Sequence, residues 1–239
     1  MEQRIAIVTG AGKRVGRVIA EDLQEAGWTV IAHVHRDDDK VPHGAIKLAV
    51  DLASPDCGER IVAACPAAPQ LLVNNAARFA HDDLHGFSPA EFAAHMAVNV
   101  QAPALLTGAF ARAEEAGDRL IVNILDAKLV APNPDFLSYT LSKAALAALT
   151  EVSARALAGQ GIRVNGIAPA LMLQSDGQTS ENFARAHVLN PLRRGVDPGD
   201  IAAAIRFLLD SVAITGEVLT LDGGQRFLAL PRDVQFLDL

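Results

Sequence analysis

Short aliphatic runs alternate with longer amphipathic segments along almost the whole chain. The runs cover residues 4–9, 29–33, 45–50, 70–74, 119–124, 162–167 and 217–221. They are apolar at nearly every position, which is typical of parallel strands that are covered on both faces. Right-handed helical crossovers between such strands place helices on both sides of the sheet. The pattern therefore predicts an α/β fold, a doubly wound parallel β-sheet of about seven strands flanked by helices on both faces.

The ends of several helices are marked by residues that favour such positions. Residues 15–26 carry apolar side chains at helical spacing and are followed by Gly27, a common residue after the end of a helix. Ser88 and Asp197, each followed by proline, predict the starts of two further helices. In doubly wound sheets ligands bind beyond the carboxyl ends of the strands. The loops after the strands therefore hold the candidate site residues.

Composition limits the organisation of the chain and its partners. With 239 residues, 50% of them hydrophobic, and no linker or repeat, we expect one domain over residues 1–239. The formal net charge is −7 without a basic tract, so nucleic acid is not an expected partner. No apolar run approaches the ~18 residues of a membrane span, and the first residues lack the pattern of a signal peptide.

The cysteines and histidines predict no metal site. Cys57 and Cys65 lie eight residues apart without a second Cys/His pair, which favours reduced structural thiols in a cytoplasmic protein. His33 and His35 share a strand face, but no third ligand is evident. We therefore expect a protein without a bound metal.

The first predicted strand runs into a glycine-rich turn, Thr9-Gly10-Ala11-Gly12-Lys13-Arg14-Val15-Gly16, and a helix follows at once. Such a turn exposes backbone N–H groups and the positive end of a helix dipole to an anion. Gly10 permits the tight turn, and Gly16 lets the helix pack closely on the sheet. This position is typical of the Rossmann-type phosphate-binding motif, whereas a Walker A loop would need a Gly-Lys-Ser/Thr sequence.

The end of the second strand indicates the nicotinamide cofactor. NAD-specific domains usually carry Asp or Glu there, to bind the ribose 2′-hydroxyl. Here Val34 ends the strand, His35 and Arg36 follow, and Arg14 lies in the turn on the same side. Cationic groups suit a 2′-phosphate, so we expect NADP(H). The acidic residues 37–39 weaken that field, and a solvated charged loop is the alternative interpretation.

Tyr139 and Lys143 lie near the start of a long predicted helix, residues 136–158. Their i, i+4 spacing puts the phenol and the ammonium on one helical face. A nearby ammonium favours the tyrosinate, so we expect the pKa of Tyr139 to lie below its ordinary value of about 10. The pair alone is a common chance pattern, and its meaning depends on the rest of the chain.

Several motifs in order along the chain resemble the short-chain dehydrogenase/reductase family over nearly its whole length. They are the Thr-Gly turn, Asp51-Leu52, Asn74-Asn75-Ala76, Asn99, Tyr139 with Lys143, Pro169 and Asp222-Gly223-Gly224. The resemblance implies hydride transfer from a nicotinamide. Tyr139 would be the acid and base, Lys143 would bind the nicotinamide ribose, and Asn99 would hold a water for proton relay. The cofactor-binding residues predicted in this way are Gly10, Lys13, Arg14, Val15, His35, Arg36, Asp51, Leu52, Asn75, Ala76, Ala77, Tyr139, Lys143, Pro169 and Leu171.

Two departures from the common family pattern narrow the comparison. Arg14 replaces the middle glycine of the turn, and Asp126 replaces the usual catalytic serine thirteen residues before the tyrosine. Both features resemble pteridine reductases and dihydromonapterin reductases, which place an aromatic residue at the position of Phe79 to stack on the pterin ring. The resemblance implies a substrate site of Arg14, Phe79, Asp126 and Tyr139.

Asp126 also carries a chemical argument of its own. A serine can donate a hydrogen bond to the oxygen that becomes negative when a carbonyl is reduced, whereas an ionised aspartate would repel that charge. An imine nitrogen instead needs a proton as hydride arrives, and a carboxylate favours the protonated form. Asp126 therefore favours C=N reduction over ketone reduction. The alternatives are a helix or turn cap without chemistry, and a degenerate catalyst.

The resemblance also implies a substrate lid at about residues 170–191, beyond which residues 225–239 form a C-terminal tail. The resemblance and the Ala-rich face of the long helix suggest a homotetramer, or a dimer, and the apolar tail suits docking on a neighbour; the alternative is that the Ala-rich face lies against the sheet. We expect a small-molecule substrate, a pterin or another planar C=N or carbonyl compound. The predicted function is NADPH-dependent reduction of a dihydropteridine-like C=N bond. The alternatives are a 3-oxoacyl or other ketone reductase, and a catalytically silent NADP-binding regulator.

Overall fold

A computed structural model describes residues 4–113, 117–175 and 177–237, and in it all the strands belong to one parallel sheet. The strand order is β3-β2-β1-β4-β5-β6-β7. The strands are β1 (Ile5–Val8), β2 (Thr29–Val34), β3 (Ile46–Ala49), β4 (Leu71–Asn74), β5 (Arg119–Ile124), β6 (Ile162–Pro169) and β7 (Val218–Leu221). The predicted doubly wound sheet is therefore confirmed, and each strand lies within or close to its predicted range.

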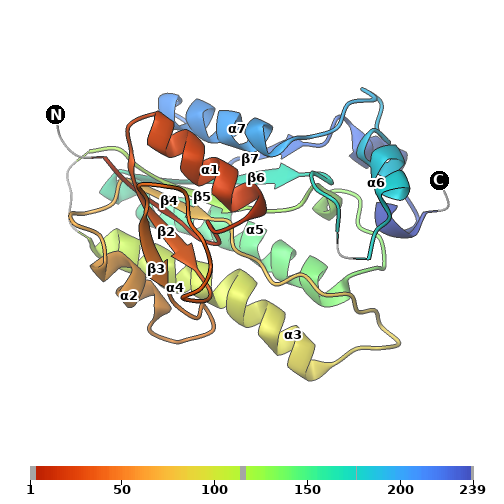
Figure 1. The fold of residues 1–239 in the computed structure, drawn as a ribbon, viewed down its shortest axis with the longest axis horizontal. Coiled ribbons are helices and arrows are strands. Elements are labelled where there is room, and N and C mark those ends of the chain that lie inside the picture. Colours follow the sequence, from red (N-terminus) through yellow and green to blue (C-terminus); the bar gives the residue numbers. More distant parts are fainter. Residues whose placement is uncertain (1–3, 114–116, 176, 238–239) are drawn as a thin grey trace.

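Helices cover both faces of this sheet (Figure 1). On one face lie α1 (Arg14–Glu25) and α7 (Pro198–Asp210), which contact each other; on the other lie α2 (Cys57–Ala63), α4 (Ala102–Arg112) and α5 (Leu137–Leu157). The shorter helices are α3 (Pro89–Met96), which packs on α5, and α6 (Ser180–His187), beyond the carboxyl ends of the strands (Figure 1).

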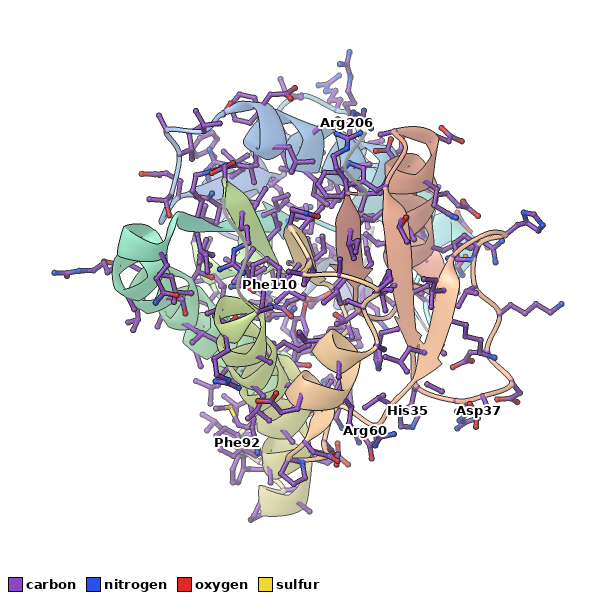
Figure 2. The ribbon with its side chains drawn as sticks, turned by 90° about the vertical axis from the view of Figure 1, so that its left-hand side faces the viewer. His35, Asp37, Arg60, Phe92, Phe110 and Arg206 are labelled. Atoms are coloured by element: carbon purple, nitrogen blue, oxygen red, sulfur yellow. The ribbon has the colours of Figure 1, made fainter. Side chains whose placement is uncertain are left out.

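One apolar cluster on each face holds the layers together. Ile19 and Leu208 bring α1 and α7 onto one face, and Ile61 and Phe110 bring α2 and α4 onto the other. Figure 2 shows Phe110 pointing into the interior, while Asp37 lies at the periphery. Burying one large apolar side chain is worth about 1.5–3 kcal/mol, so these clusters supply much of the force that closes the fold.

The predicted helix ends agree with the structure to within a residue. The Ser88 hydroxyl accepts the Glu91 backbone N–H at 3.4 Å at the start of α3. At the start of α7, the Asp200 carboxylate accepts the Asp197 backbone N–H at 2.8 Å. α1 ends just before Gly27, whose φ of +81° is in the left-handed region.

A contact from a distant loop sets the start of α5. The Asp82 carboxylate, 56 residues earlier in the chain, accepts the Ser138 backbone N–H at 2.9 Å and also the Ser138 hydroxyl. Phe136, just before the helix, is buried and has a φ of +56°, a conformation that a non-glycine residue adopts only when its surroundings hold it there. Together these contacts orient the face of α5 that carries Tyr139 and Lys143.

The structure bears on the state of the two cysteines and on membrane-spanning helices. Cys57 and Cys65 are both free thiols, and burial raises the pKa of Cys65 to about 11. Within the described ranges, no helix has the length and apolarity needed to cross a bilayer.

Candidate active site

A cavity of about 1280 Å³ opens beyond the carboxyl ends of the strands, where parallel α/β sheets bind their ligands. It is formed by the loops after the strands β1 to β6 and by the C-terminal segment. Every predicted catalytic, cofactor and substrate residue lines this cavity except Asn99. The lid prediction, residues 170–191, is placed here only in part, because residue 176 lies outside the described residues.

Hydrogen bonds to β2 and to the loop after β4 fix the conformation of the glycine turn. The Gly10 backbone N–H donates to His33 Nδ1 at 3.2 Å, and His33 Nε2 donates to the Val50 carbonyl at 2.9 Å. The Thr9 hydroxyl accepts the backbone N–H groups of Asn75 and Ala76 at 2.9 and 3.0 Å. These bonds join the turn to the loop after β4, so both walls of the cavity are fixed to each other.

His33 is therefore a structural residue of the turn. Burial lowers its pKa, which keeps the ring neutral and leaves Nδ1 free to accept from Gly10. Sequence reasoning weighed His33 only as a metal ligand with His35. Across the described parts of the chain, no group of three His, Cys, Asp or Glu side chains is placed to hold a metal.

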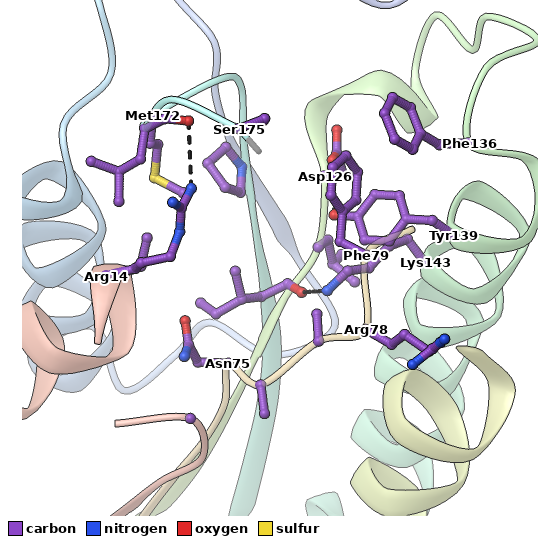
Figure 3. Close-up of a pocket in the computed structure, with 18 of the residues that line it drawn as sticks. Arg14, Asn75, Arg78, Phe79, Asp126, Phe136, Tyr139, Lys143, Met172 and Ser175 are labelled. Atoms are coloured by element: carbon purple, nitrogen blue, oxygen red, sulfur yellow. Dashed lines mark hydrogen bonds between the residues drawn. The ribbon is translucent and has the colours of Figure 1, made fainter. Parts of the chain in front are cut away.

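Arg14 connects the turn to the lid. Its backbone has a φ of +52°, and its guanidinium donates to the Gln174 carbonyl at 3.1 Å and, more weakly, to the Leu173 carbonyl at 3.5 Å. Figure 3 shows Arg14 on the other side of the cavity from Asp126 and Tyr139. In this arrangement Arg14 closes one end of the cavity, and its contact with a cofactor or substrate stays a prediction.

His35 and Arg36 lie exposed at the end of β2, on the cavity wall. Among the described residues the Arg36 guanidinium has no ion-pair partner. The Asp39 carboxylate accepts the Arg36 backbone N–H at 3.0 Å, so it is bound to the main chain of this loop. The Arg36 side chain is thus available to an anionic ligand.

Asp126, Tyr139 and Lys143 meet in the cavity (Figure 3). The Tyr139 hydroxyl donates to Asp126 Oδ2 at 3.0 Å, and the Lys128 backbone N–H donates to Asp126 Oδ1 at 2.8 Å. Lys143 Nζ donates to the Ile124 carbonyl at 2.6 Å. Asp126 is therefore a cap of the short helical turn Ala127–Leu129 and a partner of the tyrosine at once.

Burial governs the protonation of these three groups. It raises the pKa of Asp126, and it lowers the pKa of Lys143 to about 8. The pKa of Tyr139 is raised well above its ordinary value, first by burial and then by the negative charge of Asp126. The expectation that Lys143 lowers the pKa of Tyr139 is therefore wrong, because burial and the negative charge of Asp126 outweigh any effect of the ammonium, which donates to the Ile124 carbonyl. The pair holds a proton more tightly than isolated side chains would.

Asn99 lies behind the cavity rather than on its wall. It is buried in a π-helical turn, Ala97–Gln101, and its Nδ2 donates to the Arg78 carbonyl and the Ser142 hydroxyl, both at 2.9 Å. Its Oδ1 accepts the Arg78 backbone N–H at 2.7 Å. Asn99 thus positions the segment that carries Phe79, and the water relay stays a prediction.

Phe79 forms an aromatic wall next to the tyrosine. Its ring stacks on Phe136 with 4.3 Å between centroids and meets Tyr139 edge-on at 4.8 Å. The side chain remains 48% exposed, so part of the ring faces the cavity. A planar ligand can stack there beside Tyr139.

The C-terminal segment is a part of the cavity that sequence reasoning missed. Arg232 donates to both carboxylate oxygens of Asp135 at 2.7 and 2.8 Å, and Phe236 stacks on Phe136 at 5.7 Å. Residues 232–237 thus pack on their own chain, against Phe136 and Asp135, and the docking of this tail on a neighbour stays a prediction; residues 238–239 lie outside the described residues. No local pattern could reveal contacts that span 97 residues.

Comparisons with known proteins agree with this arrangement. The family model described as enoyl-(acyl carrier protein) reductase matches residues 10–226. Pteridine reductase 1 of Leishmania tarentolae is 30% identical, over 92% of this chain and 95% of its own length. The 3-oxoacyl-(acyl-carrier-protein) reductase FabG of Vibrio cholerae serotype O1 is 28% identical, over 94% of this chain and 98% of its own. The crystal structure of FolM alternative dihydrofolate reductase 1 from Brucella suis, in complex with NADP, has a TM-score of 0.85 at 33% identity and covers 94% of this chain and 95% of that one.

Proposed function

The chain belongs to the short-chain dehydrogenase/reductase family, and from this premise we propose that it is an NADPH-dependent reductase of a dihydropteridine-like C=N bond. One observation carries the proposal: the Tyr139 hydroxyl donates to Asp126 at 3.0 Å, in a cavity that Phe79 lines. This pair can supply a proton to a ring nitrogen, and the aromatic wall suits a planar ring. Similarity to a pteridine reductase and to an alternative dihydrofolate reductase supports it.

The part of the cavity beside the glycine turn and the start of α1 suits the binding of NADP(H). A Cβ at Gly16 would lie 2.3 Å from the Gly10 carbonyl oxygen, so this glycine lets α1 begin directly against the turn. That approach leaves the start of α1 facing the cavity, where its N–H groups suit a diphosphate. Asp51 and Leu52 line the same cavity and would flank the adenine, and Arg36 would bind the 2′-phosphate. When bound, the dihydronicotinamide supplies the hydride.

The protein's part in the reaction is to deliver one proton. Reduction of the C=N bond places hydride on carbon and requires a proton on nitrogen. Tyr139 carries its phenolic proton and can donate it to the nitrogen when Asp126 is protonated, because protonation removes the negative charge of Asp126 that holds this proton. Asp126, whose pKa is raised by burial, can be protonated and then return the proton to the tyrosine. General acid help of this kind contributes about 10²–10⁴-fold.

A ketone reductase is the second candidate, because a 3-oxoacyl reductase is similar over 94% of the chain. Its developing alkoxide would lie next to the Asp126 carboxylate and would lack a serine donor. Loss of one such donor costs about 10²–10³-fold in kcat. The two functions thus differ in what they require of position 126.

Replacing Arg36 by leucine is expected to weaken NADPH binding by about 1.5–3 kcal/mol, the range for hydrogen bonds to charged groups, and to leave NADH binding nearly unchanged. Fluorescence titration with both cofactors measures this difference. Arg17→Leu is the matched control, because the Arg17 side chain is also partly exposed, at 41%, but pairs with Glu21 outside the cavity. Equal affinity of the native protein for both cofactors would exclude the assignment.

Replacing Phe79 by alanine is expected to raise KM for a dihydropterin more than it lowers kcat. Stacking contributes about 0.5–1.5 kcal/mol beyond the buried area, and the ring makes no covalent or proton contact. Phe87→Ala is the control, because Phe87 is 45% exposed like Phe79 but does not line the cavity. An unchanged KM in the Phe79 variant would contradict the stacking role.

We also propose a cytoplasmic homotetramer, with a dimer as the alternative. Leu141 and Val152 on α5 are 46% and 64% exposed, which leaves apolar surface for a second copy. Because the tail packs on its own chain, the helix face carries this proposal. Light scattering at micromolar concentration is expected to report four subunits, and a monomer would refute the proposal.

A further inference from the structure

We propose that Asp233, on the C-terminal segment, is a specificity-determining residue that binds the N–H groups along one edge of a planar substrate ring. The chemistry it suits is an amidine-like edge, a ring N–H beside an exocyclic NH₂, as in an aminopyrimidinone. The inference rests on the proposed function and extends it to residues beyond the family match, which ends at residue 226.

Asp233 lines the same cavity as the aromatic wall and the tyrosine. Its side chain is 20% exposed, and Oδ2 lies 3.5 Å from Lys128 Nζ, whose side chain is only 9% exposed. The charge of Asp233 contributes to the raised pKa of Tyr139, which places the carboxylate within electrostatic reach of the reacting end. Asp233 therefore borders the cavity whose wall carries Phe79, near enough to Tyr139 for its charge to act there.

The surroundings hold this carboxylate in place. The neighbouring Arg232 binds Asp135 through two hydrogen bonds, and the Asp233 backbone N–H donates to Asp135 Oδ2 at 2.8 Å. Asp233 Oδ1 accepts the Gln235 backbone N–H at 3.1 Å, which fixes the plane of the carboxylate. A side chain that is already ordered loses little conformational entropy when a ligand binds. The free energy of its hydrogen bonds to the ligand is therefore offset less.

The free lone pairs of this carboxylate match paired N–H donors. A carboxylate accepts two parallel N–H bonds from a planar group, and such charge-assisted pairs add geometric specificity. The Gln235 backbone N–H takes one acceptor site on Oδ1 and Lys128 lies beside Oδ2, so each oxygen keeps one further acceptor site for a ligand. Asp126 and Tyr139 would lie at the C=N bond that is reduced, and Asp233 would bind N–H groups on a different edge of the same ring. A ring with a negative charge on that edge would be repelled by the Asp233 carboxylate.

The test compares two C=N substrates that differ in this edge. Dihydropterin carries the ring N–H and the amino group, and dihydroisoquinoline carries neither. For Asp233→Asn we expect KM for dihydropterin to rise about 10- to 100-fold, as for loss of hydrogen bonds to a charged group, with kcat little changed. KM for dihydroisoquinoline and NADPH affinity should stay at the native values. Asp210→Asn, an exposed aspartate on α7 outside the cavity, is the matched control and should match the native protein with both substrates.

Equal rises in KM for both substrates would overturn the proposal and leave Asp233 a purely structural residue, and an unchanged KM for dihydropterin would overturn it as well. Failure of the proposed function is distinguishable, since the native protein would then reduce neither compound. In that case calorimetry with oxidised pterin and the NADP⁺-loaded protein tests Asp233 without turnover. Weaker binding by the Asp233→Asn variant supports the proposal, and equal binding, or none by the native protein, overturns it.

Discussion

Replacing Asp126 by asparagine is expected to lower kcat for dihydropterin by about 10²–10⁴-fold, the usual loss when general acid help is removed. Asparagine preserves the shape of the side chain, and its carbonyl oxygen can still accept the Lys128 backbone N–H, while its NH₂ group, which is a donor, replaces the oxygen that accepts the Tyr139 hydroxyl. It has no acidic proton to return to the tyrosine. Steady-state NADPH oxidation measures the effect, and native NADPH affinity in the variant shows that the cavity is intact.

The pH profile separates loss of the proton from loss of structure. Burial raises the pKa of Asp126, so the protonated pair is present at low pH and is lost as pH rises through its apparent pKa. In the native enzyme kcat should fall over that range. In the Asp126→Asn variant this fall should disappear, and a variant with the native rate and the native profile would contradict the assignment.

Replacing Tyr139 by phenylalanine is expected to cost a similar factor, about 10²–10⁴-fold in kcat, because in the proposed reaction the phenol donates the proton to the substrate nitrogen. The ring that contacts Phe79 is retained, so KM should change little. Because Asp126 acts through Tyr139, the double variant should be little slower than either single variant. Losses that multiply would instead indicate two independent proton donors.

The Asp126→Ser variant distinguishes the two enzyme candidates. A serine can again donate to a developing alkoxide, so activity on a simple activated ketone should be kept or should rise, while turnover of dihydropterin falls. If Asp126→Ser and Asp126→Asn both reduce dihydropterin at the native rate, the argument from the imine is wrong. The ketone reductase would then be the better assignment.

The sheet and its helices were predictable because their signals are local. A continuous apolar run such as β5 is stable as a strand only when both of its faces are buried. Ser88 and Asp197 mark the starts of helices through hydrogen bonds with residues three positions further along the chain. The turn at Gly10 likewise follows from the residues beside it. For these elements the sequence pattern and the structure agree closely.

The parts of the site that escaped prediction depend on contacts between distant residues. Asp82 caps α5 from 56 residues away, and Arg232 reaches Asp135 across 97. The pKa of Tyr139 also could not be inferred from its spacing to Lys143, because burial and Asp126 outweigh the ammonium. Asn99 matched a motif, but the motif does not reveal its hydrogen bonds to the Arg78 backbone and to Ser142. Sequence spacing indicates which residues lie close together. Their protonation states and the hydrogen-bond partners of their side chains depend on how the folded chain packs around them.

The most direct test of the account is the ratio of kcat/KM values of the native protein, with NADPH, for dihydropterin and for a 3-oxoacyl thioester. With Asp126 in place of a serine donor, reduction of the ketone lacks a contribution of about 10²–10³-fold, whereas reduction of the C=N bond gains a proton source. We expect dihydropterin to be favoured by about 10²-fold or more. A 3-oxoacyl thioester reduced as efficiently as dihydropterin, or more so, would contradict the account.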